Sequence, residues 1–385
     1  MTNKYFFCRL CGSQEYLDLA SLDNFPKAAQ FFIQNLDNTS QDQPITLNII
    51  ECTDCGLIQL KNDPVEYYKD VITAASLSEA SKKRIIDEWE PIIKKYELDN
   101  KKAIEIGAGK GDFLIAMSNS SLDLCGLENS EENLSYARER RLNVFKGYLL
   151  DQNKLKKEYS LVISNNFLEH QPNIKAFISK MRELLVQNGF LYLSVPNVEY
   201  LLKNDCLYEF VADHLVYFSE VTLKKALEVN GFEVLEQYKK NNNNDLVVIA
   251  KLRKNINLDK SKKTVNNIIK TLKDIVTDYK NKNIIIWGAG HRALALMALA
   301  ELREIDYIVD SASFKQDKYS PILHKKIISP EVFIQLKCDL LIIMLPGSLS
   351  EQVINFLRSK EIRCEVLVFK DTPLSKNEIF KLAEI

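Results

Sequence analysis

The sequence predicts an α/β protein with a doubly wound, mostly parallel sheet, a small cysteine module before it and a second α/β unit after it. Three observations predict this architecture. Short apolar runs alternate with amphipathic stretches between about residues 102 and 250, which is typical of a parallel sheet covered on both faces. Two Cys-x-x-Cys pairs precede this region, and the alternation resumes after a Lys- and Asn-rich segment at 251–263 that we interpret as a linker. We therefore expect domains at 1–65, 66–256 and 257–385.

The N-terminal module contains two Cys-x-x-Cys pairs, and a glycine follows each pair. The four cysteines are Cys8, Cys11, Cys52 and Cys55. Four thiolates in two such pairs can complete the tetrahedral shell of a structural zinc ion and leave no open position. Disulfide pairing is the weaker alternative, because we expect no secretory leader in the first residues. The Gln-, Asn- and Asp-rich residues 34–43 should form a loop or an edge.

Seven apolar runs define the expected central sheet. They are 103–106, 122–127, 144–145, 161–163, 190–195, 232–235 and 246–250. The last two runs are separated by a short polar turn, so they should pair antiparallel. A helix is expected before the first run, at 76–96, where apolar residues recur at helical spacing. Seven strands that end in such a hairpin are the layout of the class I methyltransferase sheet, which uses S-adenosylmethionine.

The turn after the first strand has the spacing of a ligand-binding loop. Glycines occupy every second position from Gly107 to Gly111, just after Glu105, and a glycine lets the backbone approach a ligand where a Cβ would clash. The spacing differs from the Gly-x-Gly-x-x-Gly that holds a pyrophosphate, and Glu128 ends the next strand, where a carboxylate can accept the ribose hydroxyls. We interpret this as a site for S-adenosylmethionine. Its expected contacts are Glu105, Gly107, Ala108, Gly109, Gly111, Phe113, Glu128, Asn129, Asn165 and Tyr68.

Two of the four histidines lie on loops that should open onto the ligand crevice. His170 follows Glu169 in the loop after the fourth strand, and His214 follows Asp213 between the fifth strand and the next helix. The carboxyl ends of strands in open α/β sheets face the ligand. Imidazole titrates near neutral pH, so both histidines are candidates for proton transfer. The alternative is that both are structural residues of a turn or a helix start.

A second glycine turn marks the C-terminal unit. The pattern Gly-x-Gly-x-x-Ala at 288–293 follows the apolar run 284–287, and Asp310 comes about 20 residues later. By itself this pattern would indicate a dinucleotide such as NAD. The remaining expected elements of this Rossmann-like domain are a first helix at 265–276, a second at 293–302, and strands at 307–309, 340–345 and 366–369.

The order of these parts resembles the sugar C-methyltransferases. The resemblance rests on the cysteine pairs, the donor loop, an Asn-x-x-x-Glu-His motif at 165–170, an acid-His-Leu-x-Tyr-Phe-Ser motif at 213–219, and the Rossmann-like C-terminal domain. It implies S-adenosylmethionine as the cofactor, zinc in the cysteine module, and a nucleotide-linked deoxy-keto-sugar as the substrate. In that family the C-terminal domain is not known to need a dinucleotide, so the resemblance implies a structural or substrate-contacting role for it.

The resemblance also implies a mechanism. His214, with Asp213 as its orienting carboxylate, would take the proton alpha to the ketone, and His170 and Glu169 would lie nearby. The chain departs from the family pattern at Val211, where an aromatic residue is usual, and at 71–72, where another tyrosine is often found. Methylation of oxygen or nitrogen in a sugar-like metabolite is therefore one alternative. An NAD-linked oxidoreductase or epimerase that uses the C-terminal turn is a second, and a zinc-organised binding protein without activity is a third.

The charge balance points to a small-molecule substrate. Fifty-one basic and 52 acidic residues are thoroughly mixed and leave a net charge of −1, so we expect no uniform basic face for nucleic acid or a membrane. No apolar run approaches the roughly 20 residues of a membrane helix. The other four cysteines stand among apolar neighbours and are interpreted as reduced core thiols. These patterns predict a cytoplasmic protein, and they do not predict its oligomeric state.

Overall fold

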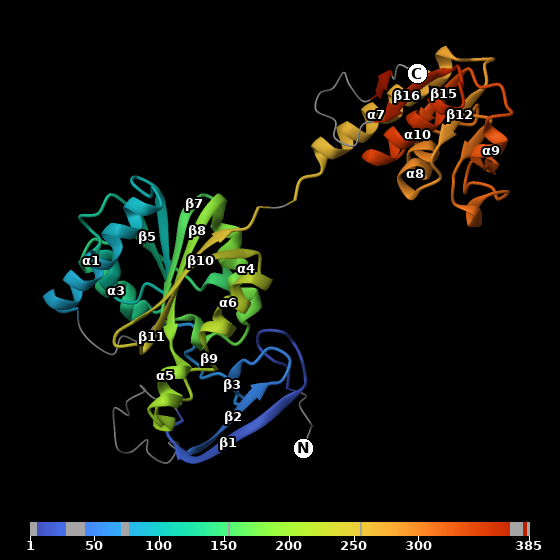
Figure 1. The fold of residues 1–385 in the computed structure, drawn as a ribbon. Coiled ribbons are helices and arrows are strands. Elements are labelled where there is room, and N and C mark those ends of the chain that lie inside the picture. The colour runs from blue at the N-terminus through green and yellow to red at the C-terminus, as the bar shows by residue number, and fades with distance from the viewer. Residues whose placement is uncertain are drawn as a thin grey trace. The chain divides into compact units, whose positions relative to one another are not determined.

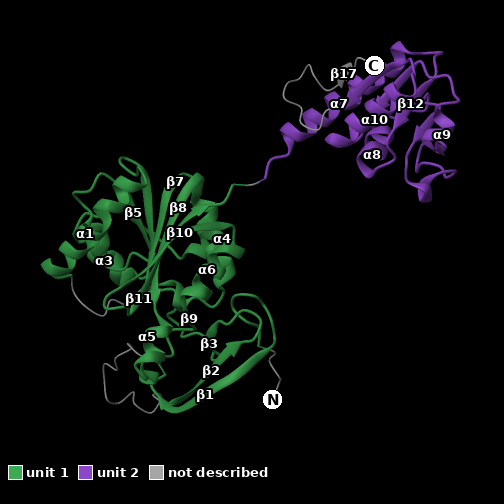
Figure 2. Ribbon diagram, in the orientation of Figure 1, with its two compact units in different colours: residues 1–255 green, residues 256–385 purple. Residues whose placement is uncertain are grey.

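The computed structural model describes residues 6–27, 43–70, 77–152, 155–254, 256–369 and 380–382. The chain divides into two compact units, residues 1–255 and 256–385 (Figure 2). Val71 and Ile72, and most of the expected loop at 34–43, lie outside the described residues. None of the described helices combines the length and the apolar composition that crossing a bilayer requires.

The first unit contains the predicted seven-stranded sheet (Figure 1). Its strands are β4 (Lys102–Ile106), β5 (Asp123–Glu128), β6 (Val144–Lys146), β7 (Tyr159–Asn165), β8 (Leu185–Pro196), β10 (Phe232–Lys240) and β11 (Asp245–Leu252). Their order is β10-β11-β8-β7-β4-β5-β6. β11 is antiparallel to β8 and to β10, and the other neighbours are parallel. The class I methyltransferase fold is therefore confirmed.

Successive residues of a strand point to opposite faces of the sheet. Both faces of this sheet carry apolar side chains, and helices cover both. In β11, Val247 and Ile249 pack with α1 (Glu79–Lys95) and α2 (Asp112–Ala116). Leu246, Val248 and Ala250 pack on the other face with α4 (Ile174–Leu184) and α6 (Glu220–Val229). The other described helical segments of this unit are α3 (Glu131–Glu139), α5 (Val198–Lys203) and single turns at Leu149–Asp151, Leu168–His170 and Leu207–Glu209.

The cysteine module is built on a second, antiparallel sheet. Its strands are β1 (Tyr16–Phe25), β2 (Ile45–Cys52), β3 (Ile58–Leu60) and β9 (Val216–Tyr217), in that order. β9 comes from the second histidine loop and is not expected from the sequence. Gln59 pairs with Val216, and the amide of Leu60 donates to the carbonyl of Leu215 at 2.9 Å. The module is thus joined directly to the loop that carries His214.

The second unit is a six-stranded α/β domain in the order β14-β13-β12-β15-β16-β17. Its strands are β12 (Ile284–Trp287), β13 (Tyr307–Val309), β14 (Ile327–Ile328), β15 (Leu340–Ile343), β16 (Glu365–Phe369) and β17 (Phe380–Leu382). All neighbours are parallel except β17. The described helices are α7 (Asp259–Asp278), α8 (His291–Leu299), α9 (Pro330–Phe333), α10 (Ser348–Ser359) and a single turn at Ser313–Lys315.

The linker expected at 251–263 is shorter than predicted. β11 continues to Leu252, and α7 already begins at Asp259. The buried stripe of α7 consists of Ile268, Leu272 and Val276, four residues apart, so the helix is held by its C-terminal half. Its lysine-rich first turns are solvated helix, which composition alone does not distinguish from a linker.

Candidate active site and metal centre

The donor loop joins β4 to α2 in a conformation that requires glycine. Gly107, Gly109 and Gly111 have φ values of 78°, 54° and 83°, which is the left-handed region that glycine adopts at low cost. A Cβ on Gly126 of the neighbouring strand β5 would lie 2.7 Å from the Cβ of Ala108. The loop is thus pressed against β5. An added Cβ on Gly111 would also come 2.3 Å from Cδ1 of Leu142, so that side chain would have to move, and the φ of 83° is the stronger reason for glycine here.

Glu128 lies beside this loop, as the sequence predicts. One carboxylate oxygen accepts from the amide of Gly109 at 2.7 Å, and the other accepts from the amide of Ser130 at 2.7 Å. Burial raises the pKa of Glu128, and the two amides oppose this shift. Each carboxylate oxygen has a second lone pair, so Glu128 can still accept ribose hydroxyls while the main chain holds it in place.

Glu105 and Asn165 meet across β4 and β7. The Asn165 amide donates to one Glu105 oxygen at 2.9 Å, whereas the other oxygen is buried and has no hydrogen-bond partner. Burial raises the pKa of Glu105 to about 8. An unpartnered buried acceptor costs free energy unless a ligand satisfies it. The ammonium and sulfonium groups of S-adenosylmethionine are cations that suit this position, so the residues present fit the donor.

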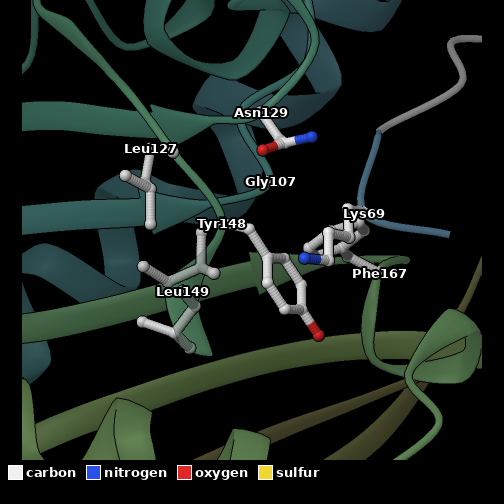
Figure 3. A pocket seen from close by; sticks show the side chains of 9 residues that line it. Lys69, Gly107, Leu127, Asn129, Tyr148, Leu149 and Phe167 are labelled. Atoms are coloured by element: carbon white, nitrogen blue, oxygen red, sulfur yellow. The ribbon is translucent and has the colours of Figure 1, made fainter. Parts of the chain in front are cut away.

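A small pocket lies beside the donor loop and is open to solvent (Figure 3). It is lined by Lys69, Ile106, Gly107, Leu127, Asn129, Gly147, Tyr148, Leu149 and Phe167. Of the predicted donor contacts, Gly107 and Asn129 lie here, and the Tyr68 ring meets the Tyr148 ring edge to face at 5.9 Å between centroids. Asn129 donates to Asp70 at 2.6 Å. The pocket is therefore closed on one side by the segment that contains Tyr68, Lys69 and Asp70.

One predicted donor contact lies in the hydrophobic core, and two residues that the prediction did not include line the pocket. Phe113 packs against Trp89, with 5.0 Å between ring centroids, in the core between α1 and the sheet, so it does not line the pocket. Lys69 and Tyr148 do line it. Tyr148 follows the short strand β6, and its place after a strand was the sequence signal that could have identified it.

His170 and His214 are brought together, with ring centroids 4.7 Å apart and an interplanar angle of 82°. His170 Nδ1 lies 2.9 Å from the main-chain carbonyl oxygen of Asp213. A carbonyl only accepts, so Nδ1 carries the hydrogen and Nε2 is left as an acceptor. The Asp213 carboxylate accepts from the hydroxyl of Tyr67 at 2.6 Å. Among these contacts Asp213 orients His170 through its main chain, whereas the sequence analysis expected its carboxylate to orient His214.

Burial sets the protonation of this cluster. It lowers the pKa of His170, and burial together with the neighbouring His170 lowers the pKa of His214 to about 3. Burial raises the pKa of Glu169 to about 8, and one Glu169 oxygen is buried without a hydrogen-bond partner. The His214 imidazole is therefore neutral at neutral pH, and in the free protein it is a weaker base than an exposed imidazole.

The four predicted zinc ligands form a single cluster. The Sγ atoms of Cys8 and Cys55 are 3.5 Å apart, and so are those of Cys11 and Cys52. In a tetrahedral site with Zn–S bonds near 2.3 Å, sulfurs stand about 3.8 Å apart, so the cluster is compatible with zinc.

The backbone around the cysteines repeats the same turn twice. The amide of Gly12 donates to the carbonyl of Cys8 at 2.9 Å, and that of Gly56 donates to Cys52 at 2.8 Å. Both glycines have positive φ, 78° and 76°. The side-chain amide of the buried Gln59 donates to the Cys8 sulfur at 3.2 Å. Such outer contacts orient thiolate ligands.

In the second unit, a carboxylate likewise accepts a hydrogen bond from the glycine turn at 288–293. The Asp310 carboxylate accepts from the amides of Ala289 and Ala312, each at 2.9 Å, and from Lys315 at 2.8 Å. The two amide bonds match those of Glu128. The additional ion pair with Lys315 means that a ribose hydroxyl would have to compete for this carboxylate.

Two family models match the chain. A methyltransferase domain matches residues 76–237, and a C-methyltransferase C-terminal domain matches residues 233–364. The chain belongs to the C-methyltransferase family. A methyltransferase domain of this fold uses S-adenosylmethionine, in keeping with the donor loop described above.

Several known proteins are similar to this chain. C-methyltransferase NovU of Streptomyces niveus is 22% identical over 240 residues, which cover 60% of this chain and 56% of the relative. A ubiquinone biosynthesis O-methyltransferase of Pelagibacter ubique is 25% identical over 121 residues, 30% of this chain and 50% of the relative. The chain thus spans about half the length of these relatives. The solved magnesium protoporphyrin IX methyltransferase of Synechocystis superposes with a TM-score of 0.38 at 17% identity, covering 47% of this chain and 90% of that one.

Proposed function

We propose that the protein transfers a methyl group from S-adenosylmethionine to a carbon atom of a nucleotide-activated keto-deoxy sugar, with His214 as the general base. The observation that carries this proposal is the position of Phe167. Phe167 lines the donor pocket, and the centroid of its ring is 6.3 Å from that of His170, which in turn contacts His214. A donor in the pocket therefore has neutral imidazoles close to it, which is the arrangement that removing a proton beside a methyl donor requires.

S-adenosylmethionine supplies an electrophilic methyl group when bound. His214 would accept the proton from the carbon next to the ketone, and the electron pair of the broken C–H bond would move to the ketone oxygen as an enolate. The enolate carbon then bonds to the methyl carbon, and the C–S bond electrons leave with sulfur. His170 would accept a hydrogen bond from the substrate through Nε2, the nitrogen that Asp213 leaves open. Glu105 and Glu128 hold the donor.

The domain order supports the substrate class. The chain carries both the methyltransferase domain and the C-methyltransferase C-terminal domain, and one relative is named a C-methyltransferase. The resemblance to sugar C-methyltransferases adds the activated sugar. The resemblance implies a structural or substrate-contacting role for the second unit. Asp310 is already engaged by Lys315, so this turn is less suited to the ribose of a dinucleotide.

We also propose that Cys8, Cys11, Cys52 and Cys55 hold one structural zinc ion. A shell of four thiolates leaves no position for substrate, so the ion acts through the fold. The free thiols of the described chain favour a reducing compartment, and we assign the protein to the cytoplasm.

Methylation of a hydroxyl is the second candidate, because one relative is an O-methyltransferase and a neutral imidazole can also take a hydroxyl proton. Solvent exchange separates the two reactions. A substrate found among nucleotide-linked deoxy-keto-sugars is incubated with the enzyme in deuterium oxide, and mass spectrometry follows deuterium at the carbon beside the ketone. We expect exchange that depends on His214. A substrate that is methylated without any such exchange would contradict carbon methylation and support the hydroxyl.

A further inference from the structure

Glu169, His170 and His214 form a second cluster of possible metal ligands, separate from the four cysteines. One carboxylate oxygen and one nitrogen of each ring all lie within 4.8 Å of one another. Metal–ligand bonds near 2.0–2.2 Å hold such atoms roughly 3 Å apart, so small side-chain rotations bring them onto one ion. Two histidines and one carboxylate are a common ligand set for a divalent transition metal.

The carboxylate of Glu169 provides the first independent sign of a ligand. The residue is 2% exposed, and its Oε2 is buried without a hydrogen-bond partner. A buried carboxyl oxygen without a partner is costly. The two imidazoles next to it are the neighbours that would share a cation with it, and such a cation would satisfy the oxygen.

The second sign is the hydrogen bond of His170. Its Nδ1–H donates to the main-chain carbonyl of Asp213 at 2.9 Å, which presents Nε2 as the free lone pair. A histidine that binds a metal through one nitrogen usually donates the hydrogen of the other to a carbonyl or a carboxylate, and this fixes its tautomer and orientation. The Asp213 carboxylate is in turn held by Tyr67 at 2.6 Å, so the supporting shell is built.

We propose that Glu169, His170 and His214 bind one divalent transition-metal ion of the Zn²⁺ type. The site has one carboxylate and two neutral nitrogen ligands, which suits zinc, cobalt and nickel better than magnesium or calcium, whose ligands are oxygens. Three protein ligands leave coordination positions open for water or substrate. This metal site does not depend on the sugar substrate proposed above.

The site has a consequence for catalysis. A His214 nitrogen that binds a metal cannot accept a proton at the same time, so occupancy of this site and base catalysis by His214 exclude each other. The bound ion is therefore an inhibitor of methyl transfer, and the protein without an ion in this site is the form that turns over.

Cobalt binding tests the proposal. The protein is first brought to one zinc per chain in total, as checked by metal analysis, so that the four thiolates are filled and the second site is not. Co²⁺ is then titrated by calorimetry and absorption. We expect one Co²⁺ per chain, with the absorption of nitrogen and oxygen ligands and without thiolate-to-cobalt charge transfer. Two variants each remove one ligand: Glu169→Gln, which keeps the side-chain volume, and His170→Asn. Each should lower the affinity for Co²⁺ by more than the roughly 10–100-fold that losing an outer-shell partner costs. His291→Asn, at an exposed histidine of the second unit, is the matched control and should leave it unchanged.

Absence of a second ion in the wild-type protein would overturn the metal site, and so would Co²⁺ binding that both variants leave unchanged. The wild-type titration decides this even if a variant fails to fold. Methyl transfer measured in the same samples separates the two proposals. Turnover that depends on His214 without any second ion would leave the proposed function standing and remove the metal site. If Co²⁺ binds, both variants weaken it and the bound ion raises turnover, the metal site stands. His214 is then contradicted as the base.

Discussion

The side-chain amide of Asn165 donates to Glu105 at 2.9 Å, and this bond satisfies only one of the two carboxyl oxygens. The second oxygen is buried without a partner. The two residues come from adjacent parallel strands, β4 and β7, so the sheet itself fixes their contact. The donor site therefore contains an acid that is prepared for a cationic ligand.

Donor affinity should depend on pH through Glu105. In the free protein its pKa is about 8, so the carboxyl is protonated at neutral pH, and a cationic donor favours the ionised form. Affinity should therefore rise as the pH rises toward 8 and level off above it, with a loss of up to about tenfold per pH unit below the pKa. Calorimetry across this range measures the slope, and Glu105→Gln should flatten it. An equal slope in the variant would assign the effect to another group.

Removal of Glu128 should weaken the donor site. Glu128→Ala deletes the acceptor for the ribose and releases the amides of Gly109 and Ser130, so we expect donor affinity to fall by about 1.5–3 kcal/mol. Glu132→Gln, at an exposed acid on α3, is the control and should bind normally. Unchanged affinity of Glu128→Ala in calorimetry would show that this carboxylate does not hold the donor.

His214→Asn should slow methyl transfer by a factor of about 10²–10⁴ while donor affinity stays intact, because only proton removal is lost. The comparison with His170→Asn is informative, since His170 is the ring that Asp213 orients. If His170→Asn is slowed and His214→Asn turns over normally, the base is His170. Donor binding by calorimetry serves as the folding control for both variants.

Zinc loss should affect catalysis more than donor binding. The cysteine module holds the His214 loop through β3 and β9, whereas the donor loop rests on β4 and β5. We expect one zinc per chain in freshly purified protein, and we expect Cys52→Ser to lose this metal and most of the methyl transfer while donor affinity changes little. Metal analysis that finds no zinc, or a variant that retains it, would contradict the site.

Most strands of the central sheet could be predicted because they are apolar runs, although β6 has only three residues. β9 could not be predicted, because Val216 and Tyr217 are only two residues and their partners lie more than 150 residues earlier. The place of Phe113 in the loop predicts a contact with the donor, and in the structure its ring packs against Trp89 in the core. Side-chain direction of this kind depends on tertiary packing and not on spacing.

The location of the histidine cluster could be predicted from the sequence, but its hydrogen bonds could not. The topology rule placed both histidines at the ligand end of the sheet, and the structure brings their rings together. The role of Asp213 could not be predicted, because its carbonyl and its carboxylate serve different partners, His170 and Tyr67. A sequence pattern of an acid beside a histidine does not reveal which of the two groups is used.

The strand that β9 adds to the N-terminal sheet also governs the order of assembly during synthesis. β3 leaves the ribosome early, but its free edge is covered only after residue 217 has emerged. Until then the nascent chain exposes unpaired main-chain groups along β3, a surface that invites pairing with other chains. A shortened protein that ends before β9 would retain this exposed edge permanently. The N-terminal module is therefore the first part of the chain to be made and among the last to be completed.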